Sequence, residues 1–178
     1  MKADSGSNEV LTKARFHRAW SFNQLGDFER AVEDQAEALS LASNASYRPL
    51  INYSLYLKKA KRFEESLLIA RQASKIESLE TSRGSMMTQY HIGWSLFELG
   101  RYREAIDAFT KGVPYQPDYA AVYWLRARSY ELLGDTVNAR QDYEILAELL
   151  ADPDGQNDLG EWGAEAASKL KSLGLEIP

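Results

Sequence analysis

Few residues of this 178-residue chain are of the types that carry out catalysis or hold metals. It has two histidines, His17 and His91, and no cysteine, which excludes thiolate metal sites, disulfides and cysteine nucleophiles. The acidic run at residues 152–158 resembles a calcium loop in composition but lacks the glycine and the final glutamate at the required positions. The sequence offers no Ser-His-Asp order, phosphate loop or paired acids. We therefore predict that the chain is not an enzyme and needs no cofactor.

The charge and hydropathy of the sequence limit the kinds of molecule that the protein is expected to bind. The formal net charge of −5 argues against nucleic acid, because phosphate binding depends on clustered Lys and Arg. No apolar run approaches the roughly 18 residues of a membrane span. Residues 1–8 are polar and lack the apolar region of a signal peptide. We expect a cytoplasmic protein without membrane insertion. Its remaining acidic residues are expected to lie mostly on solvent-exposed helix faces.

The elements that must position any binding residues belong to a repeat. A short motif recurs as Leu25-Gly26-Asp27-Phe28, Lys61-Arg62-Phe63, Leu99-Gly100-Arg101-Tyr102 and Leu133-Gly134-Asp135-Thr136. Its last positions, Phe28, Phe63, Tyr102 and Thr136, are 35, 39 and 34 residues apart. A period of this size predicts stacked helical hairpins, an architecture that binds proteins far more often than it catalyses.

Each unit is predicted to be two helices joined by a tight turn. In the third unit we expect helices over 86–99 and 102–113, separated by Gly100, because glycine tolerates the left-handed backbone at a helix end. Asp27 and Asp135 follow the equivalent glycines and are predicted to cap the next helix. Lys61 stands in the glycine position of unit two, which predicts a less favourable turn there.

Small and large residues alternate in a register that is kept through all four units, which lets two helices nest closely. In the first helices the small residues are Ala19, Ser54, Gly93 and Ala127, and the large residues three positions on are Phe22, Leu57, Leu96 and Tyr130. The second helices carry Ala31, Ser66, Ala105 and Ala139, then Gln35, Ala70, Phe109 and Tyr143, then Ala38, Ala73, Gly112 and Leu146. With these residues the chain resembles the tetratricopeptide repeat (TPR) family, departing from its pattern at Lys61, Thr136 and Leu146. The resemblance implies an all-α, right-handed superhelical solenoid of antiparallel helix hairpins.

The expected organisation has three parts. Residues 1–11 are a polar N-terminal segment, and 12–153 hold four repeats at 12–46, 47–80, 86–119 and 120–153, with 81–85 as an inserted loop. The insertion is either a tolerated loop or a hinge between the two halves. Residues 154–178 are a turn and a C-terminal capping helix, opened by a capping box at 158–161 and ended by Gly174. The apolar stripe of this helix is Trp162, Ala166, Leu170 and Leu173; it either caps the stack or folds back into the groove.

The family resemblance implies that the first helices line an inner, concave wall, and helical geometry then selects the residues that face it. They are mostly aromatic, of the kind that dominates binding hot spots. The predicted peptide-binding groove is Phe16, His17, Trp20, Ile51, Asn52, Leu55, Tyr90, His91, Trp94, Phe97, Trp124 and Arg128, with Asn23, Lys59 and Glu131 beside it. Some of these rings could instead pack between neighbouring first helices as core.

The best-known groove chemistry of the family is a Lys, Asn and Arg clamp that grips a chaperone's C-terminal carboxylate. Asn52 fits that clamp, but its other positions hold Phe16, Trp20, Met87 and His91. A hydrophobic peptide or an amphipathic helix therefore fits better. His17 and His91 lie two units apart, too far for one metal ion, so no metal site is expected.

The sequence therefore predicts a non-catalytic scaffold that binds a peptide or amphipathic helix of another protein in a concave aromatic groove. The alternative is an assembly component that self-associates through its convex face or its end repeats. Homo-oligomerisation stays open under both interpretations.

Overall fold

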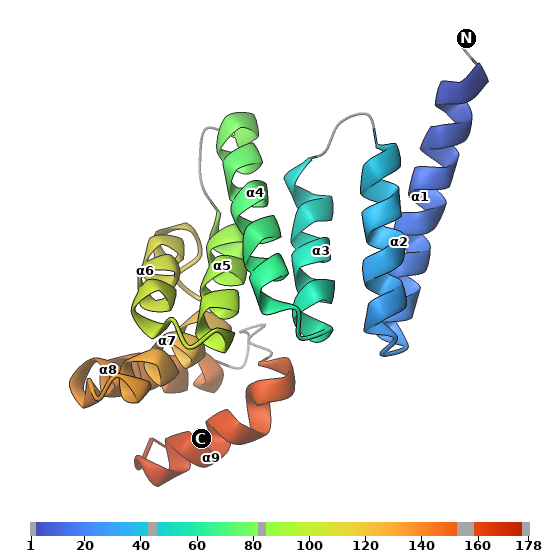
Figure 1. Ribbon diagram of the computed structural model, residues 1–178. Helices are drawn as coiled ribbons and strands as arrows, with labels where there is room; N and C mark the ends of the chain where they lie inside the picture. Colours follow the sequence, from blue (N-terminus) through green and yellow to red (C-terminus); the bar gives the residue numbers. More distant parts are fainter. Residues whose placement is uncertain (1–2, 43–45, 82–84, 153–158, 176–178) are drawn as a thin grey trace.

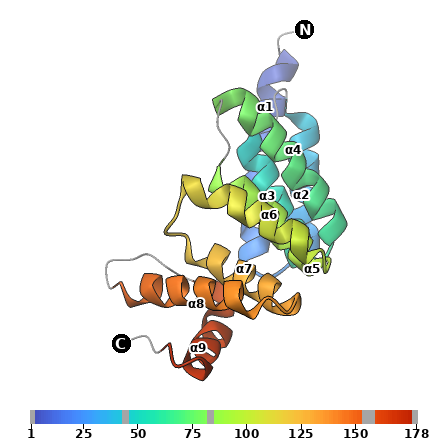
Figure 2. The ribbon, with the colours of Figure 1, turned by 90° about the vertical axis from the view of Figure 1, so that its left-hand side faces the viewer.

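The computed structural model of the chain describes residues 3–42, 46–81, 85–152 and 159–175, and over these residues it is helical without a strand. The helices are α1 (Ala3–Gln24), α2 (Phe28–Leu41), α3 (Tyr47–Lys59), α4 (Phe63–Thr81), α5 (Met86–Glu98), α6 (Tyr102–Gly112), α7 (Ala120–Leu132), α8 (Thr136–Ala151) and α9 (Gly163–Ser172), with short 3-10 turns η1 (Val113–Tyr115) and η2 (Gly160–Trp162). Consecutive helices pair as α1·α2, α3·α4, α5·α6 and α7·α8, and the pairs stack in chain order (Figures 1 and 2). The predicted all-α solenoid of helix hairpins is confirmed.

The turns inside the hairpins follow the glycine rule. Gly26, Gly100 and Gly134 have φ between +72° and +79°, the left-handed region that costs other residues energy. Lys61 adopts φ +60° at the equivalent point, and no other described non-glycine residue has a positive φ. The fold thus imposes on Lys61 the backbone conformation that the repeat requires, at a steric cost.

The predicted small positions lie where helices meet. Gly93 illustrates why: a Cβ atom built on it would lie 2.5 Å from Cε1 of Phe109, closer than carbon atoms can approach. Phe109 itself is fully buried, so α5 and α6 touch through the bare backbone of Gly93. The other small residues of the register are also buried in the hairpin interfaces.

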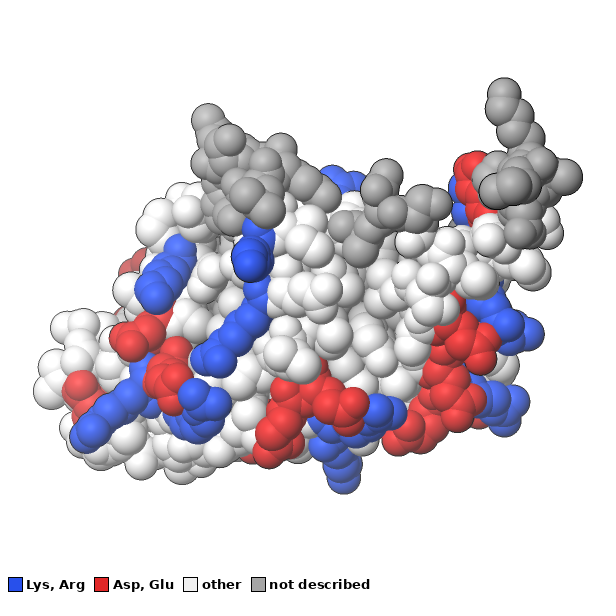
Figure 3. Space-filling model, turned by 45° about the horizontal axis from the view of Figure 1, so that its top comes forward, with Lys and Arg blue, Asp and Glu red and all other residues white. Residues whose placement is uncertain are grey.

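Two hairpins are bridged by ion pairs in which the carboxylate is buried. In unit one Arg18 donates to both oxygens of Asp34 at 2.5 and 2.6 Å, and in unit four Arg126 donates to Asp142 at 2.8 and 2.7 Å. Asp34 and Asp142 are 4% and 3% exposed. The prediction placed most acidic residues on solvated faces; these two are exceptions because each carboxylate is turned toward an arginine one helix away, and Glu77, 1% exposed, is another. Elsewhere acidic and basic side chains are interspersed over the surface, as on the face drawn in Figure 3.

The ends of two elements differ from the prediction. Helix α4 continues to Thr81, so part of the inserted length is helix, because residues 75–80 contain no helix-breaking residue; residues 82–84 of the predicted loop lie outside the described residues. Helix α1 begins at Ala3, within the predicted polar segment. The last helix begins at Gly163, after η2, and ends at Ser172, two residues before Gly174 (φ +71°), where the end was predicted. The predicted turn at 154–158, including Asp158 of the capping box, lies outside the described residues.

No helix within the described ranges is long and apolar enough to cross a membrane.

Candidate functional site

The predicted groove residues come from α1, α3, α5 and α7, and the structure divides them by exposure. We call the side formed by these four helices the first-helix face. Its exposed members are His17, Trp20 and Asn52; its half-buried members are Phe16, Leu55, Phe97 and Arg128; its buried members are Ile51, Tyr90, His91, Trp94 and Trp124.

The register of each first helix explains this division. The residue directly after the small residue points outward from the face, and we call these the outward positions: Trp20, Leu55, Trp94 and Arg128. The residue three before the small residue points toward the neighbouring hairpins; this set is Phe16, Ile51, Tyr90 and Trp124. Trp124 is 1% exposed and packs on Tyr143 of α8, with ring centroids 5.9 Å apart, so it offers no surface to a ligand in this structure.

The outward positions hold the largest aromatic surface of the face. Trp20 on α1 is 56% exposed, whereas Trp94 on α5 is 8% exposed. Trp94 packs on Lys58 and Tyr90, and it is also covered by Trp162, whose ring meets that of Trp94 edge to face with centroids 4.8 Å apart. Trp94 also donates from Nε1 to Oε1 of Glu98 at 3.1 Å, which fixes the orientation of its ring.

The residues that cover this part of the face belong to the chain's own residues 159–175, which we call the C-terminal segment. Leu159 is 5% exposed within the main core cluster, and Ala166 and Leu170 are fully buried. Glu165 pairs with Arg128, and Lys169 pairs with Glu131, both on α7. Figure 1 shows α9 beneath α7 and α8. The segment therefore contacts the predicted groove residues Trp94 and Arg128 directly.

A buried polar pair lies beneath Trp94. Nζ of Lys58 is 2.7 Å from Nδ1 of His91 and 4.2 Å from the centroid of a Trp94 ring, and both side chains are 3% exposed. Burial lowers the pKa of Lys58 well below its ordinary value, and burial together with the nearby lysine lowers the pKa of His91. Nζ of Lys58 and Nδ1 of His91 thus share a hydrogen bond away from solvent. Lys58 is absent from the predicted groove residues, because the helical register assigns its neighbour Lys59 to the wall.

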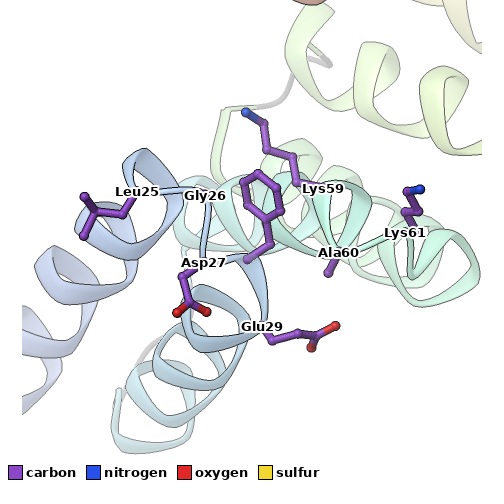
Figure 4. A pocket seen from close by; sticks show the side chains of 8 residues that line it. Leu25, Gly26, Asp27, Glu29, Lys59, Ala60 and Lys61 are labelled. Atoms are coloured by element: carbon purple, nitrogen blue, oxygen red, sulfur yellow. The ribbon is translucent and has the colours of Figure 1, made fainter.

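Two pockets continue the face toward the hairpin turns. A pocket of about 550 Å³ lies between the α1–α2 turn and the α3–α4 turn; Figure 4 shows Leu25 at one side and Lys59 and Lys61 at the other. The adjoining pocket, of about 240 Å³, is lined by Phe28, Lys58, Lys59, Lys61, Phe63, Trp94, Glu98 and Glu161. Glu161 of the C-terminal segment thus lies in a pocket that is lined by lysines, aromatic rings and one further carboxylate, that of Glu98.

The two histidines are placed differently: His91 is buried with Lys58, whereas His17 is exposed on α1. Among the residues that the structure describes, no group of three or more His, Cys, Asp and Glu side chains could hold a metal ion. The chemistry that the site offers is therefore apolar and aromatic contact, flanked by cationic side chains.

Comparisons with known proteins agree with this architecture. The chain is 30% identical to mouse tetratricopeptide repeat protein 16 over 142 residues, 76% of this chain and 18% of that protein. It is 24% identical to human general transcription factor 3C polypeptide 3 over 131 residues, 74% of this chain and 14% of that protein. The chain thus spans less than a fifth of the length of either relative.

Solved structures share the fold at low identity. MamA (residues 41 to the end) from Desulfovibrio magneticus superposes with a TM-score of 0.69 at 17% identity, over 92% of this chain and 95% of that chain. YrrB, a TPR protein with an unusual peptide-binding site, superposes with a TM-score of 0.69 at 14% identity, over 90% and 74%. Models of the tetratricopeptide repeat match residues 12–44 and 90–155, together more than half of the chain. The chain belongs to the tetratricopeptide repeat family.

Proposed function

We propose that the chain is a non-catalytic protein-interaction module that binds a peptide or amphipathic helix of a partner protein along the first-helix face. The observation that carries this proposal is the contact between Trp162 and Trp94: a short segment places its aromatic side chain on Trp94 in the way a bound peptide would. A tryptophan that is buried against another aromatic ring in this way is typical of a binding hot spot.

The open half of the face supplies further contact surface. Trp20 is more than half exposed, and His17 and Asn52 are exposed beside it on α1 and α3. A tryptophan buries about 150–250 Å² when it is covered, at a low cost in side-chain entropy. YrrB has the same fold and a peptide-binding site, which supports the proposal by analogy.

The test compares capture of partners from a lysate of the source organism by three proteins: wild type, a Trp20→Ala, Asn52→Ala double variant, and a Leu68→Ala control. All three substituted side chains are exposed, so the fold should be kept, which circular dichroism checks. A partner lost only by the double variant supports the proposal. A partner retained by the double variant and lost by the control places binding on the second-helix side and contradicts it.

A second candidate function is self-assembly through an end repeat. Leu132, Leu133 and Val137 form an apolar group at the α7–α8 turn and are 49%, 42% and 67% exposed. Neighbouring exposed apolar side chains of this kind favour a protein contact. Light scattering tests it: a monomer at high concentration would exclude this candidate, and a dimer abolished by Val137→Asp would favour it.

A further inference from the structure

The contrast between Trp20 and Trp94 shows what the C-terminal segment does to the face. The two tryptophans occupy equivalent outward positions in units one and three, yet they are 56% and 8% exposed. Trp162 covers the second of them and no described residue stacks on the first. The same repeat surface is therefore open in unit one and occupied in unit three.

The occupying segment has a defined chemistry at its start. Leu159 and Trp162 are apolar and pack into the core and onto Trp94, while Glu161 lines the same pocket as Lys59 and Lys61. Gly160 between them has φ +52°, and a Cβ there would meet nothing. Glycine is thus needed for the backbone bend and not for space.

The lysines around this pocket are suited to bind an acidic side chain of a partner protein. Lys59 and Lys61 form no ion pair with another residue that the structure describes, although most arginines nearby are paired with acids. Lys61 holds its position at φ +60° despite the cost of that conformation. Cationic side chains of this kind steer and select acidic partners more than they add affinity.

The remainder of the segment is held by the buried side chains of Ala166 and Leu170 and by charge. Glu165 and Lys169, one turn apart on α9, pair with Arg128 and Glu131, one turn apart on α7. Each of the four side chains keeps 26–55% of its surface exposed, so each pair contributes little and is weakened by salt. The ion pairs therefore add little to the buried contacts of Ala166 and Leu170, which hold α9 on the stack, whereas Trp162 before α9 is only partly buried.

We propose that the C-terminal segment occupies the binding site of the partner within the same chain. The surface between Lys59 and Trp94, which we call the strip, binds a partner segment that carries an acidic residue directly before an aromatic one. Residues 159–162 leave the strip when that partner binds. This rests on the proposed function and adds to it the class of ligand and a competitor within the chain.

The experiment uses a fluorescein-labelled synthetic peptide of residues 159–175, titrated by anisotropy into full-length wild type and the full-length Trp162→Ala variant. The variant should bind the peptide at least about tenfold more tightly, because a site that its own segment fills in most molecules shows a proportionally weaker apparent affinity. A peptide with Ala in place of Trp162 should lose binding, and one with Gln in place of Glu161 should bind several-fold more weakly.

Two further protein variants make the result specific. Glu165→Lys in the full chain leaves Trp162 intact but breaks the pair with Arg128, and it should also raise the affinity for the unmodified peptide. The double substitution Lys59→Glu, Lys61→Glu in the Trp162→Ala background should weaken the affinity for the unmodified peptide. Lys111→Glu, on the exposed surface of α6, should leave this affinity unchanged.

Equal affinity of wild type and Trp162→Ala for the peptide, or no binding by either, would overturn the inference. So would a wild-type dimer that Trp162→Ala converts to a monomer, since the segment would then sit on a second copy.

The experiment also distinguishes failure of this inference from failure of the proposed function. If the lysate partner is lost by the Trp20, Asn52 variant but captured equally by wild type and Trp162→Ala, the module function stands and the internal competition is refuted.

Discussion

Gly93→Ala is expected to destabilise the fold although it replaces glycine by the best helix former. The added Cβ would lie 2.5, 2.6 and 2.8 Å from three ring atoms of Phe109, whereas real Cβ contacts essentially never fall below 3.0 Å. Phe109 is fully buried and cannot move aside, so α5 and α6 must separate. Overpacking of this severity costs about 3 kcal/mol, and the gain in helix propensity returns about 1 kcal/mol. The free energy of unfolding should fall by about 2 kcal/mol.

Urea unfolding followed by circular dichroism measures this change. Gly163→Ala is the matched control, because a Cβ at Gly163 would meet nothing within 4 Å; this variant should be neutral or more stable by up to about 1 kcal/mol. Phe109→Leu should cost less in the Gly93→Ala background than in wild type, because the smaller side chain leaves room for the new methyl group.

A Gly93→Ala protein that is more stable than wild type, by the same amount as the control, would refute the reasoning. It would mean that the backbone of α5 does not touch Phe109, and that the small–large register assigns the wrong residues to the hairpin interface.

Three other substitutions test separate features. Lys61→Gly should stabilise the fold by about 1 kcal/mol in the same urea assay, because glycine removes the strain of φ +60°; a loss of stability would show that the lysine side chain matters more than the strain. Trp124→Ala should cost about 3–5 kcal/mol, because the ring is buried against Tyr143, and a change below about 1 kcal/mol would place it at the surface instead. The hydrogen bond from Arg18 lowers the pKa of Asp34, so this carboxylate stabilises the fold above its unfolded pKa of about 3.9 and loses that effect as the pH falls through its folded pKa. Asp34→Asn should therefore be less stable than wild type at pH 7, with the gap narrowing below about pH 4 in urea melts; a gap that does not change with pH would contradict it.

Local rules explain why most of the fold could be predicted from the sequence. The turn glycines, the caps at Asp27 and Asp135, and the bounds of α5 and α6 depend on residues within a few positions of each other. The small–large register repeats in all four units, so each unit supports the interpretation of the others.

The ion pairs with buried carboxylates depend on contacts between helices and were missed. Arg18 and Asp34 are 16 residues apart, as are Arg126 and Asp142, and both pairs occupy equivalent positions in units one and four. That recurrence was available in the sequence. A charged residue taken alone, however, is more often solvated than buried, so the pairing is visible only once the helices are placed side by side.

The candidate site was harder to predict, because exposure on the first-helix face depends on what covers it. Trp20 and Trp94 have the same place in the repeat, but Trp20 lies on the end helix α1, whereas Trp94 lies on the internal helix α5 against Lys58 and is also covered by Trp162. The apolar stripe of the last helix fits both an end cap and a segment folded back on the groove. The structure places Ala166 and Leu170 of α9 in the core and Trp162 of η2 on the face, so the C-terminal segment takes both parts.

Any partner that binds units three and four must displace the C-terminal segment, which weakens its apparent affinity. If the C-terminal segment covers its strip in about 99 of 100 molecules, a ligand for the open form binds with a Kd raised about 100-fold, equivalent to about 2.7 kcal/mol. The aromatic pair that Trp162 makes with Trp94 is of a size that a ligand with similar chemistry can match. Trp20 carries no such penalty, since it is already exposed. A partner that contacts units one and two first would then hold its remaining residues close to the covered strip and compete there at a high local concentration. Binding should therefore proceed from the open end of the stack toward the covered one, and substitution of Trp20 should slow association more than substitution of Trp94 does.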